Sequence, residues 1–487
     1  MLALLSRALT WALAALLLAG ALLFAAVSWK MLTYRHEVVV SEGAVGLGVR
    51  SILDGVPPYD RARFEREPFV VLPYTPLYYL LTAPVMGLTK APFAAGRLVS
   101  IAFALGAALV AGFIAARLTG FRRPGAAAAL LWLSFYPVVF WGTAQRVDAA
   151  AIFLELVGLA IALSEREKGR IPWAALPPFV LAWATHQFLV AGLVAVTVDL
   201  VLRDRRRGLP FAAAAAGSVA AGFLLLSIGT HGAFWRATVL GAVSAHAGSA
   251  RPFLGSPWNV LLFALAGVTV WRRRERLLGI YLALGLALAV GTQGSFPPFF
   301  SPLAAMAILV AALLCDAASR PRLRVALLGA LVSFGTIHLL VEMRSLVRER
   351  IAGLRPDGPR LAVASALASM TSPEGTILAQ DAGLVLSARR APGIADPLVL
   401  STLAENGAWD PARLAPGIRE GRYDAIVLDR PLEAITGRER ETRWVAPLKD
   451  EIARAYRLVD VLRFDAAWHF LEPERYVYRP KTVPETF

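Results

Sequence analysis

The sequence predicts an α-helical polytopic membrane protein with about eleven transmembrane helices, followed by a small extracytoplasmic α/β domain. Three observations predict this class. Of the 487 residues, 57% are hydrophobic and only 17% are charged, whereas soluble domains carry about 25% charged residues. Long apolar segments alternate with short basic clusters over the first 350 residues. Beyond Gly353, strand-like and helix-like segments alternate instead, so we divide the chain into a helical domain, 1–350, and a tail domain, 351–487.

Charge and cysteine content exclude several classes of protein. The net charge is +15, but the basic residues cluster between apolar segments. That arrangement is typical of juxtamembrane Lys and Arg and not of a nucleic-acid-binding face. The single cysteine, Cys315, excludes an intramolecular disulfide framework and a cysteine zinc site. The apolar segment before Trp29 has no clear cleavage site, so we interpret it as a retained first helix.

The basic clusters predict the topology, because Lys and Arg favour cytoplasmic loops. With the N-terminus inside, clusters such as 203–207 and 272–276 fall on the cytoplasmic side if each apolar segment crosses in turn. Residues 171–202 begin and end inside, which favours a hairpin of two short helices bending at "WATHQF". The expected spans are the N-terminal segment, 96–116, 124–142, 148–164, the hairpin, 209–229, 257–271, 277–291, 299–316 and 323–343. This topology places the protein in the cytoplasmic membrane with its tail domain outside.

The first outer loop, 30–95, contains an apolar stretch that could pass for a further span. It reads "YTPLYYLLTAPVMGL" (74–88), and counting it as a span would move Arg122 and Arg123 outside. We therefore interpret it as a short helix on the outer leaflet, with Pro76 in its first turn. A short tilted span remains the alternative.

The tail predicts a small α/β fold. "GTILAQD" and "YDAIVLD" are typical of buried strands, and "RLVDVLRF" and "AWHFLEPE" suggest further strands. Its candidate polar residues are Asp381, Arg389, Arg390 and Asp396, to which the sequence assigns no role. The tail could admit an acceptor, and simple support of the outer loops is an equal alternative.

Two acids fall on the predicted outer side. Glu42 follows Ser41 at the start of a helical stretch, where an acid near the positive end of the helix dipole is also an ordinary structural feature. Arg146 and Asp148 stand between two apolar segments, and a local ion pair would explain them as well.

Further polar groups face the same predicted compartment. His186 and Gln187 lie at the bend of the hairpin, at membrane depth, where polar groups tend to be functional. The outer loop 230–256 contains basic and aromatic residues suited to a phosphate and a sugar ring, or to an interfacial belt. They are His231, Trp235, Arg236, His246 and Arg251.

The order of four stretches resembles the GT-C superfamily of polytopic glycosyltransferases, in the bacterial branch of protein O-mannosyltransferases and aminoarabinose transferases. The stretches are "SEG…ILDGVPPYD", "YTPLYYLLTAPV", "WGTAQRVDAAAIFLELVGLAIAL" and "FVLAWATHQFLVAGLVAVTVDLVLRDRRR". The chain departs from the branch where Ser41 replaces a common Asp, Val147 replaces Pro, and His186 replaces Lys.

The resemblance implies a glycosyltransferase that uses a sugar linked to a polyprenyl phosphate and inverts the anomeric carbon by direct displacement. Glu42 would match the first-loop acid proposed as general base, and Asp148 the second acid. Arg146, His186, Gln187 and Arg251 would contact the donor phosphate, and Tyr59, Tyr74 and Tyr78 would border the substrate. A divalent metal is possible, no other cofactor is expected, and the acceptor is an unspecified glycan, lipid or protein.

Two other functions remain open at this point. A transporter or lipid flippase would favour paired repeats and ionisable groups at the middle of the membrane. A membrane protein with a sensor-like outer domain would need neither Glu42 nor Asp148.

Overall fold

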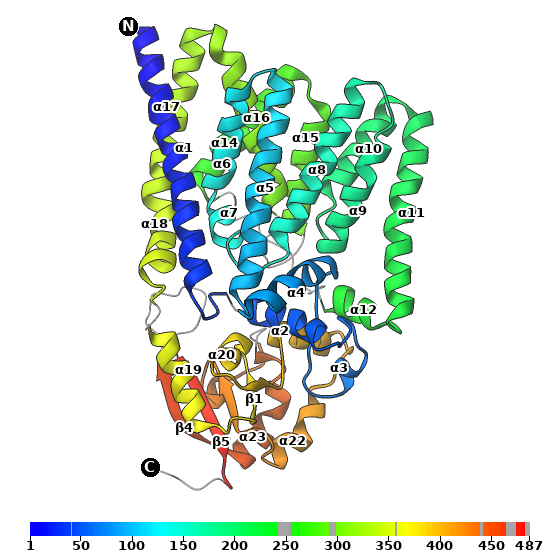
Figure 1. The fold of residues 1–487 in the computed structure, drawn as a ribbon, viewed down its shortest axis with the longest axis vertical. Coiled ribbons are helices and arrows are strands. Elements are labelled where there is room, and N and C mark those ends of the chain that lie inside the picture. The colour runs from blue at the N-terminus through cyan, green and yellow to red at the C-terminus, as the bar shows by residue number, and fades with distance from the viewer. Residues whose placement is uncertain are drawn as a thin grey trace. The chain divides into compact units, whose positions relative to one another are not determined.

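The computed structural model describes residues 1–39, 41–241, 253, 255–291, 299–355, 358–438, 442–463 and 474–482 (Figure 1). The chain forms two compact units. The helical unit comprises Met1–Met31, Leu98–Phe223 and Ala245–Ile351. The α/β unit comprises Leu32–Arg97, Leu224–Ser244 and Ala352–Phe487.

The helical unit is built around α16, Phe300–Asp316. All residues from Phe300 to Leu313 are buried, as expected for a helix that is apolar on every side. It packs against α6, α14 and α15. The helices that contribute to the unit are α1 (Leu2–Thr33), α5 (Ala94–Thr119), α6 (Arg122–Ser134), α7 (Tyr136–Trp141), α8 (Asp148–Glu167), α9 (Leu176–Thr185), α10 (Ala191–Arg203), α11 (Arg205–Gly229), α14 (Pro257–Arg273), α15 (Arg276–Gly291), α17 (Pro321–Ile337) and α18 (Met343–Leu346).

Within the described residues, five helices are long and apolar enough to cross a membrane. They begin at Leu2, Ala94, Arg205, Phe300 and Pro321. The remaining predicted spans are also helical: α8 has 20 residues but is not among the five, and the others are shorter. The hairpin 171–202 is the pair α9 and α10. The direction in which each helix crosses stays a prediction.

One predicted span is broken. The segment 124–142 forms α6 and α7, separated at Phe135, whose backbone is extended (φ −70°, ψ 133°). Pro137 explains the break, because proline has no N–H to donate to the preceding turn and its ring clashes with the carbonyl four residues earlier. The last predicted span, 323–343, also changes character: after α17 the chain continues as a π-helical turn, His338–Glu342.

The stretch 74–88 forms α4, Leu77–Thr89, in the α/β unit. At about 1.5 Å per residue, its 13 residues span roughly 20 Å, short of the ~30 Å hydrocarbon core. It packs against α2, Ser41–Leu53. The outer loop also contains α3, Ala62–Glu65. The length of α4 favours the short-helix interpretation.

The tail contains a five-stranded mixed sheet in the order β2-β1-β3-β5-β4. The strands are β1 (Thr376–Ala379), β2 (Ala391–Pro392), β3 (Ala425–Leu428), β4 (Tyr456–Arg463) and β5 (Glu474–Pro480). β1 pairs in parallel with β2 and β3, whereas β5 pairs antiparallel with β3 and β4. The predicted strands "GTILAQD", "YDAIVLD" and "RLVDVLRF" contain β1, β3 and β4. "AWHFLEPE" lies outside the described residues except for Glu474, where β5 begins.

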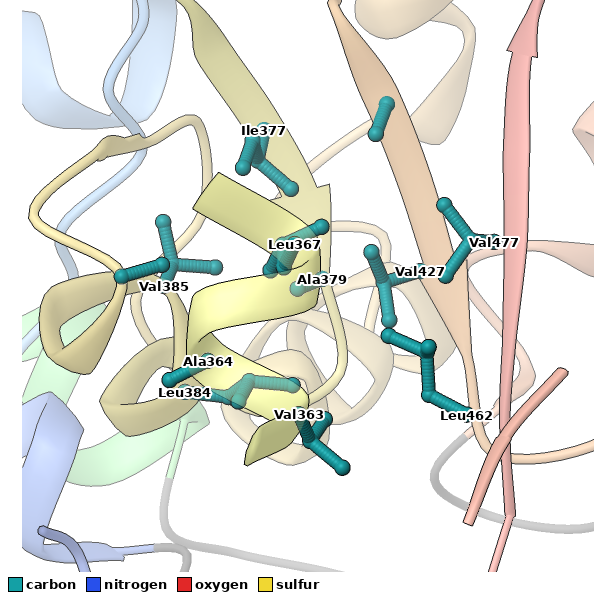
Figure 2. Packing of buried hydrophobic residues seen from close by; sticks show 12 residues of the cluster. Val363, Ala364, Leu367, Ile377, Ala379, Leu384, Val385, Val427, Leu462 and Val477 are labelled. Atoms are coloured by element: carbon teal, nitrogen blue, oxygen red, sulfur yellow. The ribbon is translucent and has the colours of Figure 1, made fainter. Parts of the chain in front are cut away.

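The core of this sheet lies beneath α19, Pro359–Met370. Figure 2 shows Val363, Ala364 and Leu367 of α19 between α20, Ala382–Ser387, and strands that contribute Ile377, Ala379, Val427, Leu462 and Val477. The other α-helices of the tail are α21 (Pro397–Glu405), α22 (Ala415–Arg419) and α23 (Lys449–Ala455). The segment 224–244 also belongs to this unit and contains α12 (Ala233–Trp235).

The first outer loop is part of this sheet-containing unit. The backbone N–H of Phe69 donates to Gly393 O at 2.9 Å, and the N–H of Ala395 donates to Phe69 O at 3.1 Å. The Tyr423 hydroxyl also donates to the Glu67 carboxylate. Residues 32–97 are therefore tied to the tail by backbone pairing and side-chain contacts. The division of the chain into a transferase domain, 1–350, and a separate tail domain, 351–487, stays a prediction.

Candidate functional site

Asp148 is the centre of a buried polar cluster in the helical unit. It is the first residue of α8 and has no solvent exposure. Its Oδ2 accepts a hydrogen bond from Arg146 Nε at 2.8 Å, and its Oδ1 lies 3.4 Å from His186 Nε2. The structure thus brings together three of the residues predicted from two separate stretches.

The Arg146 side chain is held by an aromatic ring and its backbone by a serine. The guanidinium lies over Trp141, with Cζ 4.7 Å from the ring centre, a cation–π geometry. Ser100 Oγ donates to Arg146 O at 3.0 Å and accepts from its N–H at 3.3 Å. The turn before α8 is therefore attached to α5, so the guanidinium is positioned by two elements at once.

His186 ends α9 and presents one ring nitrogen to Asp148. Its Nδ1 accepts from the N–H of Phe188 at 3.2 Å. A neutral ring in this orientation carries its proton on Nε2, the atom that faces the carboxylate. Gln187 is partly buried beside it.

Glu42 is fully buried at the start of α2, in the α/β unit, and both of its oxygens are occupied by donors. Arg97 Nε donates to Oε1 at 2.8 Å and Arg97 Nη2 donates to Oε2 at 2.6 Å. The N–H of Val38 also donates to Oε2 at 2.8 Å. The same guanidinium donates to Tyr34 O and His36 O. Through these contacts, the Glu42 carboxylate and Arg97 together fix the backbone at Tyr34, His36 and Val38. The role of Glu42 as general base stays a prediction.

The three predicted tyrosines contact the protein interior. Tyr59 is buried, donates its hydroxyl to Tyr74 O, and meets the Phe234 ring edge-to-face at 5.0 Å. Tyr78 has no exposure and donates to Gly96 O at 2.8 Å. Tyr74 is partly buried. The structure therefore brings Tyr59 and Tyr74 together.

Of the residues predicted in the loop 230–256, His231, Trp235 and Arg236 are exposed. Arg251 and His246 lie outside the described residues.

Glu155 is a buried acid that sequence reasoning missed. It lies two turns after Asp148 on α8 and has no exposure. Its Oε1 accepts from the N–H of Gly192 at 2.7 Å. Its Oε2 accepts from Tyr281 Oη at 2.9 Å and from Ser301 Oγ at 2.7 Å. Three neutral donors from α10, α15 and α16 thus converge on one carboxylate. The available signal was a single Glu in "AIFLELVGL", an apolar helix.

A second missed acid, Glu37, lies in the α/β unit beside Asp381. Both side chains are buried, and Glu37 Oε1 accepts from the N–H of Gly43 at 2.7 Å. Burial, followed by repulsion from Asp381, raises the pKa of Glu37 well above its ordinary value. Burial acts to raise the pKa of Asp381 too, but the hydrogen bond with Glu37 and the charges of Arg360 and Arg475 lower it to about 2. The two shifts favour a protonated Glu37 beside an ionised Asp381.

The other predicted tail residues support local structure. Asp396 caps α21, accepting from the N–H groups of Leu398 and Val399. Arg390 donates to Ala368 O at 2.6 Å and to Thr371 O at 2.9 Å. Arg389 occupies a left-handed backbone conformation (φ 57°).

The described residues contain no group of three or more His, Cys, Asp or Glu side chains that could hold a metal ion. A metal requirement therefore stays a prediction.

Comparison with solved structures identifies the fold. No protein-family model matches the chain, and no curated protein matches it in sequence. The structure is similar to ArnT from Cupriavidus metallidurans bound to undecaprenyl phosphate, with a TM-score of 0.63 at 16% identity, over 97% of this chain and 99% of that chain. The apo form of ArnT gives 0.59 at 17% identity, over 97% and 98%. ArnT is a GT-C membrane glycosyltransferase. The chain has the GT-C fold.

The oligosaccharyltransferase AglB from Archaeoglobus fulgidus, in complex with an inhibitory peptide and a dolichol-phosphate, shares this GT-C fold more distantly. Its TM-score is 0.51 at 12% identity, over 98% of this chain and 75% of that chain. The GT-C fold class predicted from the sequence is thus confirmed. Within this fold, the buried cluster around Asp148 and the buried Glu42–Arg97 pair are the two arrangements that contain predicted site acids.

Proposed function

We propose that the protein transfers a sugar from a polyprenyl-phosphate donor to an acceptor on the outer face of the cytoplasmic membrane. The observation that carries the proposal is the match over nearly the whole chain to ArnT bound to undecaprenyl phosphate. The buried cluster of Arg146, Asp148 and His186 supports it, because a lipid phosphate leaving as an anion needs cationic donors in a site of low polarity.

Arg146 and His186 are proposed to bind the donor phosphate, and Asp148 to position them. Arg146 Nε donates to Asp148 from the edge of the guanidinium, while one face of the guanidinium lies over the Trp141 ring. An aspartate between the Arg146 guanidinium and the His186 imidazole fixes their separation before the donor arrives, so less ordering is needed on binding. Gln187 and Arg251 are proposed as further phosphate contacts from the sequence alone.

The reaction is a direct displacement. An acceptor hydroxyl or amine attacks the anomeric carbon, the bond from that carbon to the phosphate oxygen breaks, and the lipid phosphate leaves with the bonding electrons. The acceptor proton passes to a carboxylate. Inversion follows because the acceptor approaches from the face opposite the leaving phosphate.

Glu42 remains the proposed general base and Asp148 the second acid, with different support for each. Both oxygens of Glu42 accept hydrogen bonds from Arg97, so taking up a proton would weaken these charge-assisted bonds. Asp148 has one oxygen bound by Arg146 and the other 3.4 Å from His186, a looser arrangement. Tyr59, Tyr74 and Tyr78 are proposed to shape the donor site indirectly, by supporting the first outer loop.

The test uses the full-length protein in proteoliposomes with a labelled undecaprenyl-phosphate sugar and a cell-envelope glycolipid fraction as acceptor. We expect labelled acceptor and released undecaprenyl phosphate in equal amounts, with turnover lost in Asp148→Asn. Asp316→Asn is the matched control, because Asp316 is also bound by an arginine of the helical unit, Arg273. Movement of intact donor across the bilayer without sugar transfer would instead identify a flippase, and neither transfer nor movement would favour a sensor-like protein.

A further inference from the structure

A second polar region of the helical unit lies far along α8 from Asp148, beside its last turns. A cavity of about 130 Å³ is lined there by residues of α8, α10, the start of α11 and α15. One water occupies about 30 Å³ in the liquid, so the cavity has room for a tetrahedral anion. Its charged lining residues are Arg166, Arg170, Arg203, Arg207, Asp199 and Asp204.

The cavity lining carries a formal charge of +2, since it has four arginines and two aspartates. Arg276 and Glu275, the charged partners that do not line the cavity, do not remove this excess of positive charge. Asp199 is shared, with Arg203 Nε at 2.9 Å and Arg276 Nε at 2.8 Å. Arg166 pairs with Glu275 at 3.3 Å, so these two partners bring one further positive and one further negative charge. Two arginines therefore remain without a compensating carboxylate.

Two of the arginines are well placed to receive an anion. Arg207 is held in position, since it donates to Gly169 O at 2.7 Å and lies 3.3 Å from Asp204. Arg170 is exposed and has no side-chain hydrogen bond or ion pair among the described residues. Charged and apolar groups meet here: Val196, Leu200 and Leu277 line the same cavity. An apolar wall beside a cationic rim matches a lipid headgroup, whose phosphate and acyl chains need both.

We infer that this cavity binds a phosphate-bearing anion, and that its natural occupant is the headgroup of an anionic membrane lipid. The site is separate from the Asp148 cluster and does not depend on the proposed transferase activity. Free phosphate carries the same charged group as the headgroup, but it has no apolar part that could contact the apolar wall. A general attraction of basic loops to anionic lipids is the competing explanation for the same arginines.

The chain offers a matched control for that competing explanation. Arg205 and Arg206 belong to the same basic run as Arg207 and are exposed, but they do not line the cavity. The double variants Arg170→Gln/Arg207→Gln and Arg205→Gln/Arg206→Gln therefore remove the same charge near the same place. Arg170→Gln alone changes an exposed side chain that makes no side-chain hydrogen bond or ion pair among the described residues, so we expect this variant to fold normally.

The experiment titrates the purified full-length protein with phosphatidylglycerol, with zwitterionic phosphatidylcholine and with inorganic phosphate, and counts bound molecules by native mass spectrometry. We expect saturable binding of phosphatidylglycerol, weakened about tenfold or more in the cavity double variant and about twofold or less in the control. Arg170→Gln should show an intermediate loss.

Each other outcome has a definite meaning. Equal losses in the two double variants would identify general electrostatic attraction and overturn the site. Saturable binding of inorganic phosphate as tight as that of phosphatidylglycerol would retain the anion site and reject the lipid as its occupant. Equal binding of phosphatidylcholine and phosphatidylglycerol, or no saturable binding at all, would contradict the inference.

Discussion

Glu42 and Arg97 form a bidentate ion pair in which neither side chain has any solvent exposure. The pair joins the first turn of α2 to the start of α5, and Arg97 also binds the carbonyls of Tyr34 and His36. The Nε, Nη1 and Nη2 groups of Arg97 therefore all donate to Glu42 or to the backbone that leads into α2.

Removing one partner of this pair should destabilise the α/β unit strongly. Arg97→Gln and Glu42→Gln should each lower the free energy of unfolding by about 3–5 kcal/mol, because each leaves a buried charge without its partner. The double variant should lose less than the sum of the two. The exposed pair Arg61–Glu65 is the control, where the same changes should cost less than about 1 kcal/mol.

The same variants distinguish a structural Glu42 from a catalytic one. If Glu42 is the general base, Glu42→Gln should lose far more turnover than Arg97→Gln in preparations that are equally folded. Equal losses of turnover in the two variants would assign Glu42 to positioning alone. Thermal unfolding and the sugar-transfer assay, run on the same samples, provide the comparison.

A change at Arg146 should affect catalysis more than stability. Arg146→Lys keeps the charge, but a lysine cannot both rest on Trp141 and present a planar donor to Asp148. We expect turnover to fall by about 10²–10³-fold, the usual loss for one donor to a developing anion. Arg117→Gln, which changes an exposed ion pair with Glu167, should leave turnover unchanged. A wild-type rate in Arg146→Lys would remove Arg146 from the site.

The sequence was sufficient for the helix pattern, for strands β1, β3 and β4 and for the Arg146–Asp148 pair, because each depends on periodicity or on neighbours along the chain. Long-range partners could not be derived in this way. Arg97 lies 55 residues from Glu42, and Tyr281 and Ser301 lie 126 and 146 residues from Glu155. Only the packing of helices brings such donors to an acid. The break at Phe135 could have been predicted from the sequence, because Pro137 lies inside the predicted span 124–142.

Glu155 should stabilise the bend that carries His186. Its carboxylate accepts from Gly192 N–H in the first turn of α10, a helix that begins five residues after His186. Glu155→Leu leaves this N–H and the hydroxyls of Tyr281 and Ser301 without their acceptor, at about 1–3 kcal/mol for each buried group.

Glu155→Gln should retain most of the stability, because the amide oxygen can still accept from Gly192 while the hydroxyls rotate to accept from the amide. Donor KM should rise in Glu155→Leu and return towards the wild-type value in Glu155→Gln. Tyr281→Phe, which removes a single donor, is the control. Donor KM unaffected by Glu155→Leu would contradict a role in positioning His186.

The raised pKa of Glu37 and the lowered pKa of Asp381 predict a pH dependence of stability. Burial raises the pKa of Glu37, so the folded chain keeps a proton that the unfolded chain releases above about pH 4.5. Stability should therefore fall as the pH rises from about 4.5 towards the folded pKa, by up to about 1.4 kcal/mol per pH unit. At the acid end, the lowered pKa of Asp381, about 2, means that its contribution is lost as the pH falls from about 4 to 2.

Glu37→Gln should remove the loss above pH 4.5, because an uncharged amide can accept from Gly43 and donate to Asp381 without taking up a proton. We expect the variant to have a higher Tm than the wild type at pH 8 and a similar Tm at pH 4.5. Glu65→Gln, in the same unit but exposed, should follow the wild-type profile. Parallel profiles for Glu37→Gln and the wild type would show that Glu37 is ionised in the folded protein.

The single cysteine makes the predicted topology directly measurable. Cys315→Ser gives a chain without cysteine, into which one cysteine can be placed at an exposed position in each predicted compartment. Arg205 is exposed at the start of α11 and predicted inside, and Glu420 is 61% exposed in the tail and predicted outside. In intact cells, a membrane-impermeant maleimide should label Glu420→Cys, and it should label Arg205→Cys only after permeabilisation. The reverse labelling pattern would place the tail in the cytoplasm. The proposed transferase site, predicted to face the same compartment as the tail, would then face the cytoplasm too.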